Sequence, residues 1–184
     1  MSKWVEVKIT DEMLSRAKSQ ASKHSDIPNS IMRGGGNLAG YIGEQAVLEY
    51  MEDSIPYNTK DCDVYLNPFS DNPISIDVKT KRRRVYPRDE YTCHIAEASL
   101  HQNCDMYVFC QVNFKKNPKT KWELDTSKAY ILGWMMKEDF LKKSIKLKEG
   151  QSLKDVGHSD DDKPQRADGN VVLIGDLEDI KNIP

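Results

Sequence analysis

Apolar and polar residues alternate in the middle of the chain, and this pattern predicts a pair of strands. Residues 74–79 read ISIDVK, which has the period of a half-buried strand and places Asp77 and Lys79 on its polar face. The residues just before it are rich in Asn, Pro, Ser and Asp, which form turns, so residues 63–66 are expected to pair with it antiparallel. The turn would carry Asp63 back towards Asp77.

The same kind of pattern places the other elements and indicates an α/β fold. An apolar stripe after the helix cap Thr10 predicts a first helix, and the apolar run at 106–112 is typical of a central strand covered on both faces. We expect a mixed central β-sheet flanked by helices, in the order β α α β β α β β α β. The remaining expected segments are a strand at 4–9, helices at 37–51, 95–102 and 137–144 (the last with Phe140 and Leu141 inward), polar loops at 115–125 and 151–170, strands at 129–135 and 171–176, and a helical turn at 176–180.

Glu44 stands on the apolar stripe of the second expected helix. Apolar residues follow it at three, four and seven positions, so its carboxylate shares their side of the helix. A buried carboxylate is costly without a partner, which is either a lysine in a salt bridge or a metal site reached directly or through water. Gly40 and Gly43 would let this helix approach the sheet closely, and the glycines at 34–36 are interpreted as a hinge rather than a phosphate-binding loop.

The two aspartates and the lysine indicate a metal-assisted reaction. Two carboxylates held a few ångströms apart repel each other, but together they form a good site for a hard divalent cation. A lysine beside them can hold a phosphate or a metal-bound water. Asp63, Asp77 and Lys79 therefore point to hydrolysis of a phosphodiester bond.

At these residues the chain resembles the PD-(D/E)XK nuclease superfamily, whose signature is an acidic residue on one strand followed by (D/E)-x-K on the next. Here the signature would be Asp63 and then Asp-Val-Lys at 77–79, with Asp61 competing for the place of the first acid. The context also matches. A helix bearing Glu44 precedes the expected hairpin, and a helix and an apolar strand containing Gln111 follow it.

The resemblance implies a restriction-endonuclease-like core and a site for Mg²⁺ or Mn²⁺. The implied metal ligands are Asp63, Asp77, the Val78 carbonyl and Glu44. Lys79 would orient or activate the attacking water, and Gln111 would help to place water or phosphate unless it only marks a strand leaving the core. The chain would form one domain, with a core at 37–113, an N-terminal arm and helix at 1–33 and a C-terminal elaboration at 126–184. Small stand-alone proteins of this kind are frequent in bacteriophages.

A cluster of basic residues follows the lysine of this signature. Its members are Lys81, Arg82, Arg83, Arg84 and Arg88, with Tyr86 and Tyr91 among them. The 184-residue chain has a formal net charge of −2, so affinity for nucleic acid must come from a local patch. Most charged runs are solvated loops, but this one directly follows Lys79, and we interpret it as contacting the backbone of a nucleic acid, with DNA the expected partner.

Cysteine and histidine residues raise a different possibility for the same region. Cys93, His94, His101 and Cys104 are potential zinc ligands, although their spacing matches no common zinc-finger pattern. Two alternatives to a nuclease therefore stay open: a non-catalytic nucleic-acid-binding module on the same fold, and a zinc-stabilised structural or assembly protein.

Hydropathy and the first residues bear on location. No apolar run approaches the roughly 20 residues needed to span a bilayer, and residues 1–10 lack the apolar centre of a signal peptide. We therefore expect no membrane partner and a cytoplasmic location, which for a phage protein is the host cytoplasm. The four cysteines form no C-x-x-C pair and would stay reduced there. The sequence leaves homo-oligomerisation open.

Overall fold

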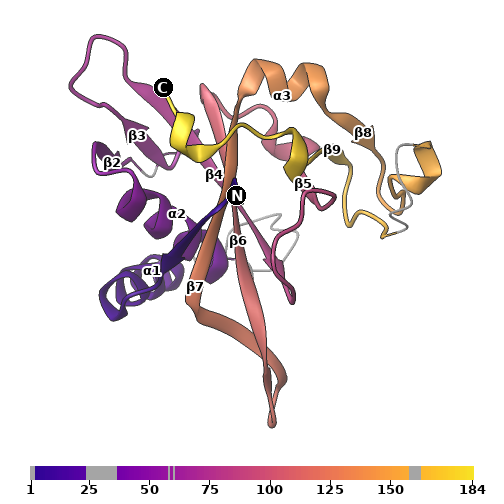
Figure 1. Cartoon of the computed structure of the whole chain (residues 1–184), viewed down its shortest axis with the longest axis horizontal. Helices are drawn as coiled ribbons and strands as arrows, with labels where there is room; N and C mark the ends of the chain where they lie inside the picture. Colours follow the sequence, from indigo (N-terminus) through magenta and orange to yellow (C-terminus); the bar gives the residue numbers. More distant parts are fainter. Residues whose placement is uncertain (1–2, 24–36, 58, 60, 158–162) are drawn as a thin grey trace.

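The computed structural model describes residues 3–23, 37–57, 59, 61–157 and 163–184. Within these residues the chain forms nine strands and three α-helices (Figure 1). The helices are α1 (Asp11–Lys23), α2 (Asn37–Tyr50) and α3 (Lys137–Lys143). The strands are β1 (Val5–Lys8), β2 (Ser54–Pro56), β3 (Val64–Leu66), β4 (Ile74–Arg83), β5 (Thr92–Ala96), β6 (Met106–Asn117), β7 (Lys121–Met136), β8 (Ile145–Leu147) and β9 (Gly169–Leu173).

A six-stranded sheet forms the centre of the fold, with the strand order β1-β7-β6-β4-β3-β2. β4 and β6 run parallel and the other neighbours run antiparallel, so the expected mixed sheet is confirmed. The expected hairpin is also confirmed, because β3 pairs antiparallel with β4 and Val64 lies opposite Ile76. Sheet and helices together establish a mixed α/β fold, whereas the restriction-endonuclease-like core stays a prediction.

A second sheet of three strands, in the order β5-β9-β8, lies across the central sheet from α1 and α2 (Figure 1). Ile76 and Val78 pack into the core shared with these two helices, whereas Tyr107 and Phe109 belong to a core shared with β5, β9 and α3. The helix expected at 95–102 is therefore wrong. Its first residues belong to β5, which pairs with the distant β9, and only the short 3-10 turn η1 (Glu97–Ser99) follows.

The polar face of β4 is buried at its start. Ser75 and Asp77 are 8% and 2% exposed, so the half-buried strand expected here is wrong for these positions. Ser75 donates from its backbone N–H and its hydroxyl to the Asp105 Oδ2, at 2.8 and 2.6 Å, which holds the segment before β6 against β4. An alternating pattern shows which face of a strand is polar, but it does not show whether a distant segment covers that face.

β6 and β7 form a long hairpin that projects from the rest of the molecule (Figure 1). Their pairing continues past Phe114 opposite Leu124 to Asn117 opposite Lys121, so the polar loop expected at 115–125 is wrong. A two-stranded hairpin in solvent has no buried face that requires apolar residues, and this is why its strands carry no apolar alternation.

Gly43 allows α2 to lie directly against β4. A Cβ atom at Gly43 would lie 1.9 Å from the Thr80 Oγ1, so this position requires glycine. At Gly40 no atom lies within 4 Å of such a Cβ, so the close approach expected of that residue is wrong. The contact at Gly43 sets the distance between α2, which carries Glu44, and β4, which carries Asp77.

Several local predictions are confirmed. The Thr10 Oγ1 accepts a hydrogen bond from the Met13 N–H at 3.2 Å, which caps α1. The helix α3 is present, with Phe140 fully buried, but the inward position expected of Leu141 is wrong because that side chain is 47% exposed. The strand expected at 171–176 is present as β9, in the second sheet rather than in the central one.

Two predictions fall partly or wholly on residues that the structure does not describe. The hinge at 34–36 lies outside the described residues, as do positions 158–162 of the polar loop expected at 151–170. The described part of that loop contains one 3-10 turn, η2 (Lys154–Val156), and ends where β9 begins. In the described parts of the chain, no helix combines the length and apolarity that crossing a bilayer requires.

Candidate functional site

The hairpin of β3 and β4 brings Asp63 beside Asp77. Asp63 lies immediately before β3, and its N–H donates to the Ile76 carbonyl at 2.9 Å, which extends the strand pairing by one position. The Val78 N–H donates to the Asp63 Oδ2 at 2.8 Å, so this carboxylate is turned towards β4. The position of Asp63 opposite Asp77 agrees with the position expected from the turn and the alternating pattern.

Lys79 forms an ion pair with the buried Asp77. The Lys79 Nζ lies 2.6 Å from the Asp77 Oδ2 and donates to the Gln102 Oε1 at 2.9 Å. The Lys79 side chain is 22% exposed and that of Asp77 only 3% exposed, so the ammonium group separates the carboxylate from solvent. Lys137 donates to the Gln102 carbonyl, which fixes the segment before β6 around this contact.

Glu44 completes a group of three carboxyls around one lysine, which we call the carboxyl cluster: Glu44, Asp63 and Asp77 with Lys79. Burial raises the pKa of Glu44 well above its usual value, and the charges of Asp63 and then Asp77 raise it further. Burial also raises the pKa of Asp63, with Asp77 as the next cause, because a protonated Asp63 can donate to the Asp77 carboxylate. One ammonium group cannot balance three buried carboxylates, so the carboxyl cluster retains protons to a higher pH than free carboxylic acids do.

The donor chemistry of the carboxyl cluster fits a hard divalent cation. Carboxylate oxygens are the ligands that Mg²⁺ and Mn²⁺ prefer, and a cation would replace the retained protons and relieve the repulsion among the three carboxyls. The side chains do not yet converge on one point. Among the described residues, no three His, Cys, Asp or Glu side chains are close enough to hold a metal ion. Because Lys79 binds an oxygen of Asp77, a cation requires this ion pair to open and the carboxylates to turn together.

Asp61 lies outside the carboxyl cluster. It is exposed, and its Oδ1 accepts a hydrogen bond from the Asn103 N–H at 3.2 Å, which fastens the segment before β6. Of the two aspartates that compete for the first acidic position, Asp63 is therefore the one beside Asp77. The Val78 side chain packs in the helix-side core and its N–H binds Asp63, while a role for its carbonyl as a metal ligand stays a prediction.

Gln111 lies farther along the sheet than the carboxyl cluster. It pairs with Lys81 in the parallel register of β4 and β6, two positions beyond Phe109, which pairs with Lys79. The Gln111 Nε2 donates to the Val85 carbonyl at 2.7 Å, so this fully buried side chain anchors the segment that follows the basic run. A role for Gln111 in placing water or phosphate stays a prediction.

Tyr41 and Gln102 are candidates that the sequence reasoning missed. Tyr41 lies one turn before Glu44 on α2, and burial followed by the charges of Glu44 and Asp63 raises the pKa of its hydroxyl. Its three-residue spacing from Glu44 was the available signal. Gln102 contacts Lys79 through a fold of the chain that no local pattern indicates.

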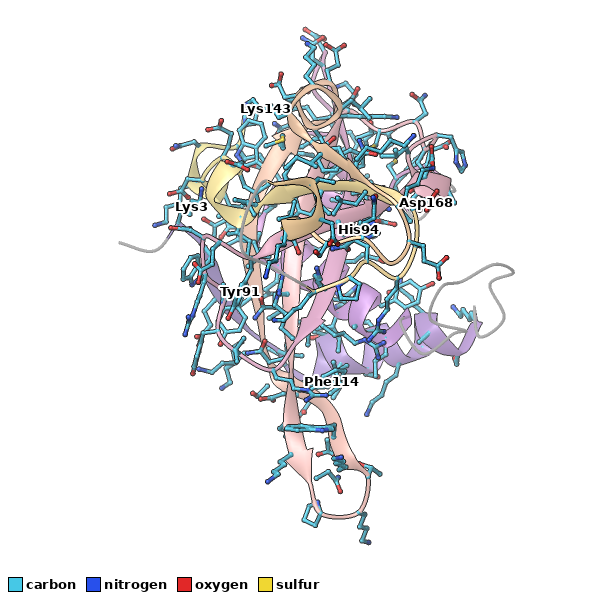
Figure 2. The ribbon with its side chains drawn as sticks, turned by 90° about the vertical axis from the view of Figure 1, so that its right-hand side faces the viewer. Lys3, Tyr91, His94, Phe114, Lys143 and Asp168 are labelled. Carbon is cyan, nitrogen blue, oxygen red and sulfur yellow. The ribbon has the colours of Figure 1, made fainter. Side chains whose placement is uncertain are left out.

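The basic run lines a groove next to the second half of β4, which we call the basic groove. It has a volume of about 1480 Å³, and Figure 2 shows three of its lining residues, Phe114, Tyr91 and His94, one above another. Aromatic rings support the arginines, with Arg82 at 5.4 Å from the centre of Phe114, Arg83 at 4.6 Å from that of Tyr91 and Arg84 at 4.3 Å from that of Trp122. The cationic residues lining the basic groove are Lys81, Arg82, Arg83, Arg84, Lys163 and Arg166. Arg88 is instead exposed, with Glu90 at 3.7 Å.

Segments from distant parts of the chain contribute to the basic groove. Burial, followed by the charge of Arg166, lowers the pKa of Arg82, so two guanidinium groups lie close together. A phosphate group would stabilise such a pair through charge-assisted hydrogen bonds. Lys163 and Arg166 fall in the polar loop expected at 151–170, where nothing in the sequence connects them with the basic run.

The four potential zinc ligands are not gathered into a metal site in the part of the chain that the structure describes. Cys93 and His94 are neighbours on β5 and point to opposite faces, with Cys93 in the core between the sheets and His94 in the basic groove. Burial raises the pKa of Cys93 to about 12 and that of Cys104 to about 11, which disfavours the thiolate form that binds zinc. His101 and Cys104 gain no further ligand from this arrangement.

Comparison of the chain with protein-family models, with curated proteins and with solved structures finds no match. A fold alone does not determine a function, because one fold supports many chemistries. The function is therefore inferred from the carboxyl cluster and the basic groove.

Proposed function

We propose that this protein is a metal-dependent nuclease that hydrolyses phosphodiester bonds, with DNA as the expected substrate. The observation that carries the proposal is the carboxyl cluster, in which burial and mutual repulsion raise the pKa values of Glu44 and Asp63. Buried carboxyls that repel each other destabilise a chain, and such groups occur preferentially at functional sites. The basic groove adjoins the same strand and supports a polyanionic substrate.

In this proposal the carboxyl cluster holds Mg²⁺ or Mn²⁺. Asp63 and Asp77 are the principal ligands, and Glu44 and the Val78 carbonyl complete the set. When bound, the cation supplies a Lewis acid that stabilises charge on the phosphate and lowers the pKa of a bound water. The protein contributes the position of the ligands, because α2 is held against β4 at Gly43 and the strand pairing holds Asp63 against β4.

Lys79 has a separate role in this proposal. Its ammonium now binds Asp77 and Gln102, and Gln102 can retain it when the carboxylate turns to a cation. From that position Lys79 can donate to a phosphate oxygen or orient the attacking water. The basic groove then holds the nucleic acid along β4 beyond the carboxyl cluster.

A nuclease assay with Mg²⁺, Mn²⁺ or a chelator tests the proposal on linear, circular, branched and single-stranded DNA and on RNA. Asp77→Ala and Asp63→Asn should each abolish cleavage while the circular dichroism spectrum is unchanged, because each removes a metal ligand. Asp61→Asn is the matched control, since Asp61 is exposed and lies outside the carboxyl cluster. Cleavage at the wild-type rate by Asp77→Ala, or equal loss in Asp61→Asn, would refute the assignment.

Calorimetric titration with Mg²⁺ separates the nuclease from its main alternative. A chain that binds DNA in the basic groove but neither binds the cation nor cleaves would be the non-catalytic nucleic-acid-binding module. Metal content of the purified protein addresses the zinc-stabilised alternative, because stoichiometric zinc would contradict the positions of Cys93 and His94 on opposite faces of β5.

A further inference from the structure

The free end of the β6–β7 hairpin is a two-stranded ribbon without neighbouring strands. β4 pairs with β6 as far as Asn113, and β1 pairs with β7 as far as Lys128. Beyond these positions the two strands pair only with each other. We call residues 114–127 the ribbon, and Figure 2 shows Phe114 near the point where it leaves the body of the molecule.

The length of the ribbon matches a groove of double-stranded DNA. Four cross-strand pairs lie beyond Asn113, from Phe114 opposite Leu124 to Asn117 opposite Lys121. At about 3.4 Å per residue they extend roughly 14 Å before the turn. The major groove of B-form DNA is about 12 Å wide and about 8.5 Å deep and admits a two-stranded ribbon. The ribbon is therefore long enough to reach the base edges.

The charge of the ribbon also suits DNA. It carries four lysines against two acidic residues, Glu123 and Asp125. Lys115 lies 3.4 Å from Glu123, whereas the other three have no acidic partner within the described ranges. The four exposed lysines are Lys115, Lys116, Lys119 and Lys121. This local excess of positive charge stands out in a chain whose net charge is −2.

The tip of the ribbon has a defined shape before any ligand binds. The Asn117 side chain donates to the Glu123 carboxylate, and its Oδ1 accepts from the N–H groups of Lys119 and Thr120, at 2.8 and 3.2 Å. These bonds hold the turn that presents Lys119 and Lys121. Such pre-organisation lowers the entropy that binding would otherwise cost.

The ribbon is continuous with the basic run. Arg82 lies over Phe114 and Arg84 over Trp122, so two arginines of β4 cover the base of the ribbon. Phe109 pairs with Lys79, and Asn117 lies eight residues farther along β6, which is roughly 27 Å at about 3.4 Å per residue. That span equals about 8 base pairs, less than one turn of about 10 base pairs. A single duplex can therefore reach both the carboxyl cluster and the ribbon.

We propose that the ribbon enters the major groove of B-form DNA and holds the duplex across the basic groove. The inference rests on the proposed function for a nucleic acid as ligand, and it specifies the substrate class as double-stranded DNA. The major groove of A-form RNA is deep and too narrow for side chains to enter, and a single strand has no such groove. Only B-form DNA offers a groove of the size of the ribbon.

Binding measured with a chelator present tests this inference without cleavage. The triple variant Lys116→Ala, Lys119→Ala, Lys121→Ala should bind a 30-base-pair DNA duplex about 10- to 100-fold more weakly than wild type, and its salt slope should fall by up to roughly 2.7, or about 0.9 per lost phosphate contact. The same variant should bind an RNA duplex or single-stranded DNA nearly as wild type does. The matched control removes three exposed lysines at the other end of the molecule, Lys142, Lys143 and Lys181, and should bind DNA like wild type.

Methylation of guanine N7 tests the groove directly, because this atom lies in the major groove. Wild type should bind the methylated duplex more weakly than the unmodified one, whereas the triple variant should not distinguish the two. Replacement of the same lysines by arginine should preserve binding, and this shows that charge rather than folding is measured. Equal weakening for DNA and RNA duplexes, or unchanged binding of DNA by the triple alanine variant, would overturn the inference.

The outcome is independent of the nuclease proposal. Asp77→Ala should bind duplex DNA as wild type does, since Asp77 lies far from the ribbon along β4. Binding that depends on the ribbon without any cleavage would support the inference and refute the nuclease. Cleavage of duplex DNA with no contribution from the ribbon would refute the inference alone.

Discussion

Replacing Glu44 with Gln removes a carboxyl group whose pKa is raised mainly by burial. Folded protein holds the Glu44 proton above the usual pKa of 4.5, whereas the unfolded chain has released it. Folded protein therefore binds more protons than unfolded protein between the usual and the raised pKa. The free energy of unfolding must fall as the pH rises through that window, because stability falls wherever the folded state binds more protons.

The magnitude follows from the number of protons. One proton retained by the folded chain lowers the free energy of unfolding by at most about 1.4 kcal/mol per pH unit. Between about pH 5.5 and about pH 7.5, Glu44 therefore accounts for a loss of up to roughly 2.7 kcal/mol in the wild type. Glu44→Gln lacks this contribution. The stability of the variant relative to wild type should rise by that amount over the same two units.

Urea denaturation at a series of pH values, with a chelator present, measures this difference. Glu49→Gln is the matched control, because Glu49 is exposed on the same helix, and it should keep the slope of the wild type. Saturating Mg²⁺ should reduce the wild-type slope, since a bound cation replaces the retained protons. An unchanged slope in Glu44→Gln would refute the reasoning that burial and repulsion keep this carboxyl protonated.

Two further substitutions examine the lysine and the helix contact. Lys79→Ala should lower kcat by roughly 10²- to 10⁴-fold and leave the calorimetric affinity for Mg²⁺ undiminished, because the ammonium acts on water or phosphate; parallel loss of both would contradict that role. Gly43→Ala should lower the free energy of unfolding by about 1–3 kcal/mol in thermal denaturation, because its Cβ would lie 1.9 Å from the Thr80 Oγ1. Gly40→Ala, with no atom within 4 Å, should be neutral or stabilising, and equal effects at both glycines would show that the contact with Thr80 is unimportant.

Local sequence was sufficient to predict the framework of the carboxyl cluster. The turn residues at 67–73 and the alternation after them indicated that Asp63 returns to Asp77 and that Lys79 stands beside it. The spacing of apolar residues after Glu44 placed its carboxylate on the inner side of α2. These features depend on the two-residue period of a strand and the 3.6-residue period of a helix, which are properties of the backbone over a few residues.

The coverage of the site and the pairing of distant strands were not accessible in this way. Residues 92–96 form a strand because β9 lies beside them, and residues 115–125 form a ribbon because each strand of the hairpin supplies the partner of the other. Asp77 is buried, rather than on a solvated face, because the segment around Gln102 folds over it. Arg166 joins Arg82 by the same kind of long-range contact. Each of these outcomes depends on hydrogen bonds and burial between residues far apart in the chain, which no local period of hydrophobicity records.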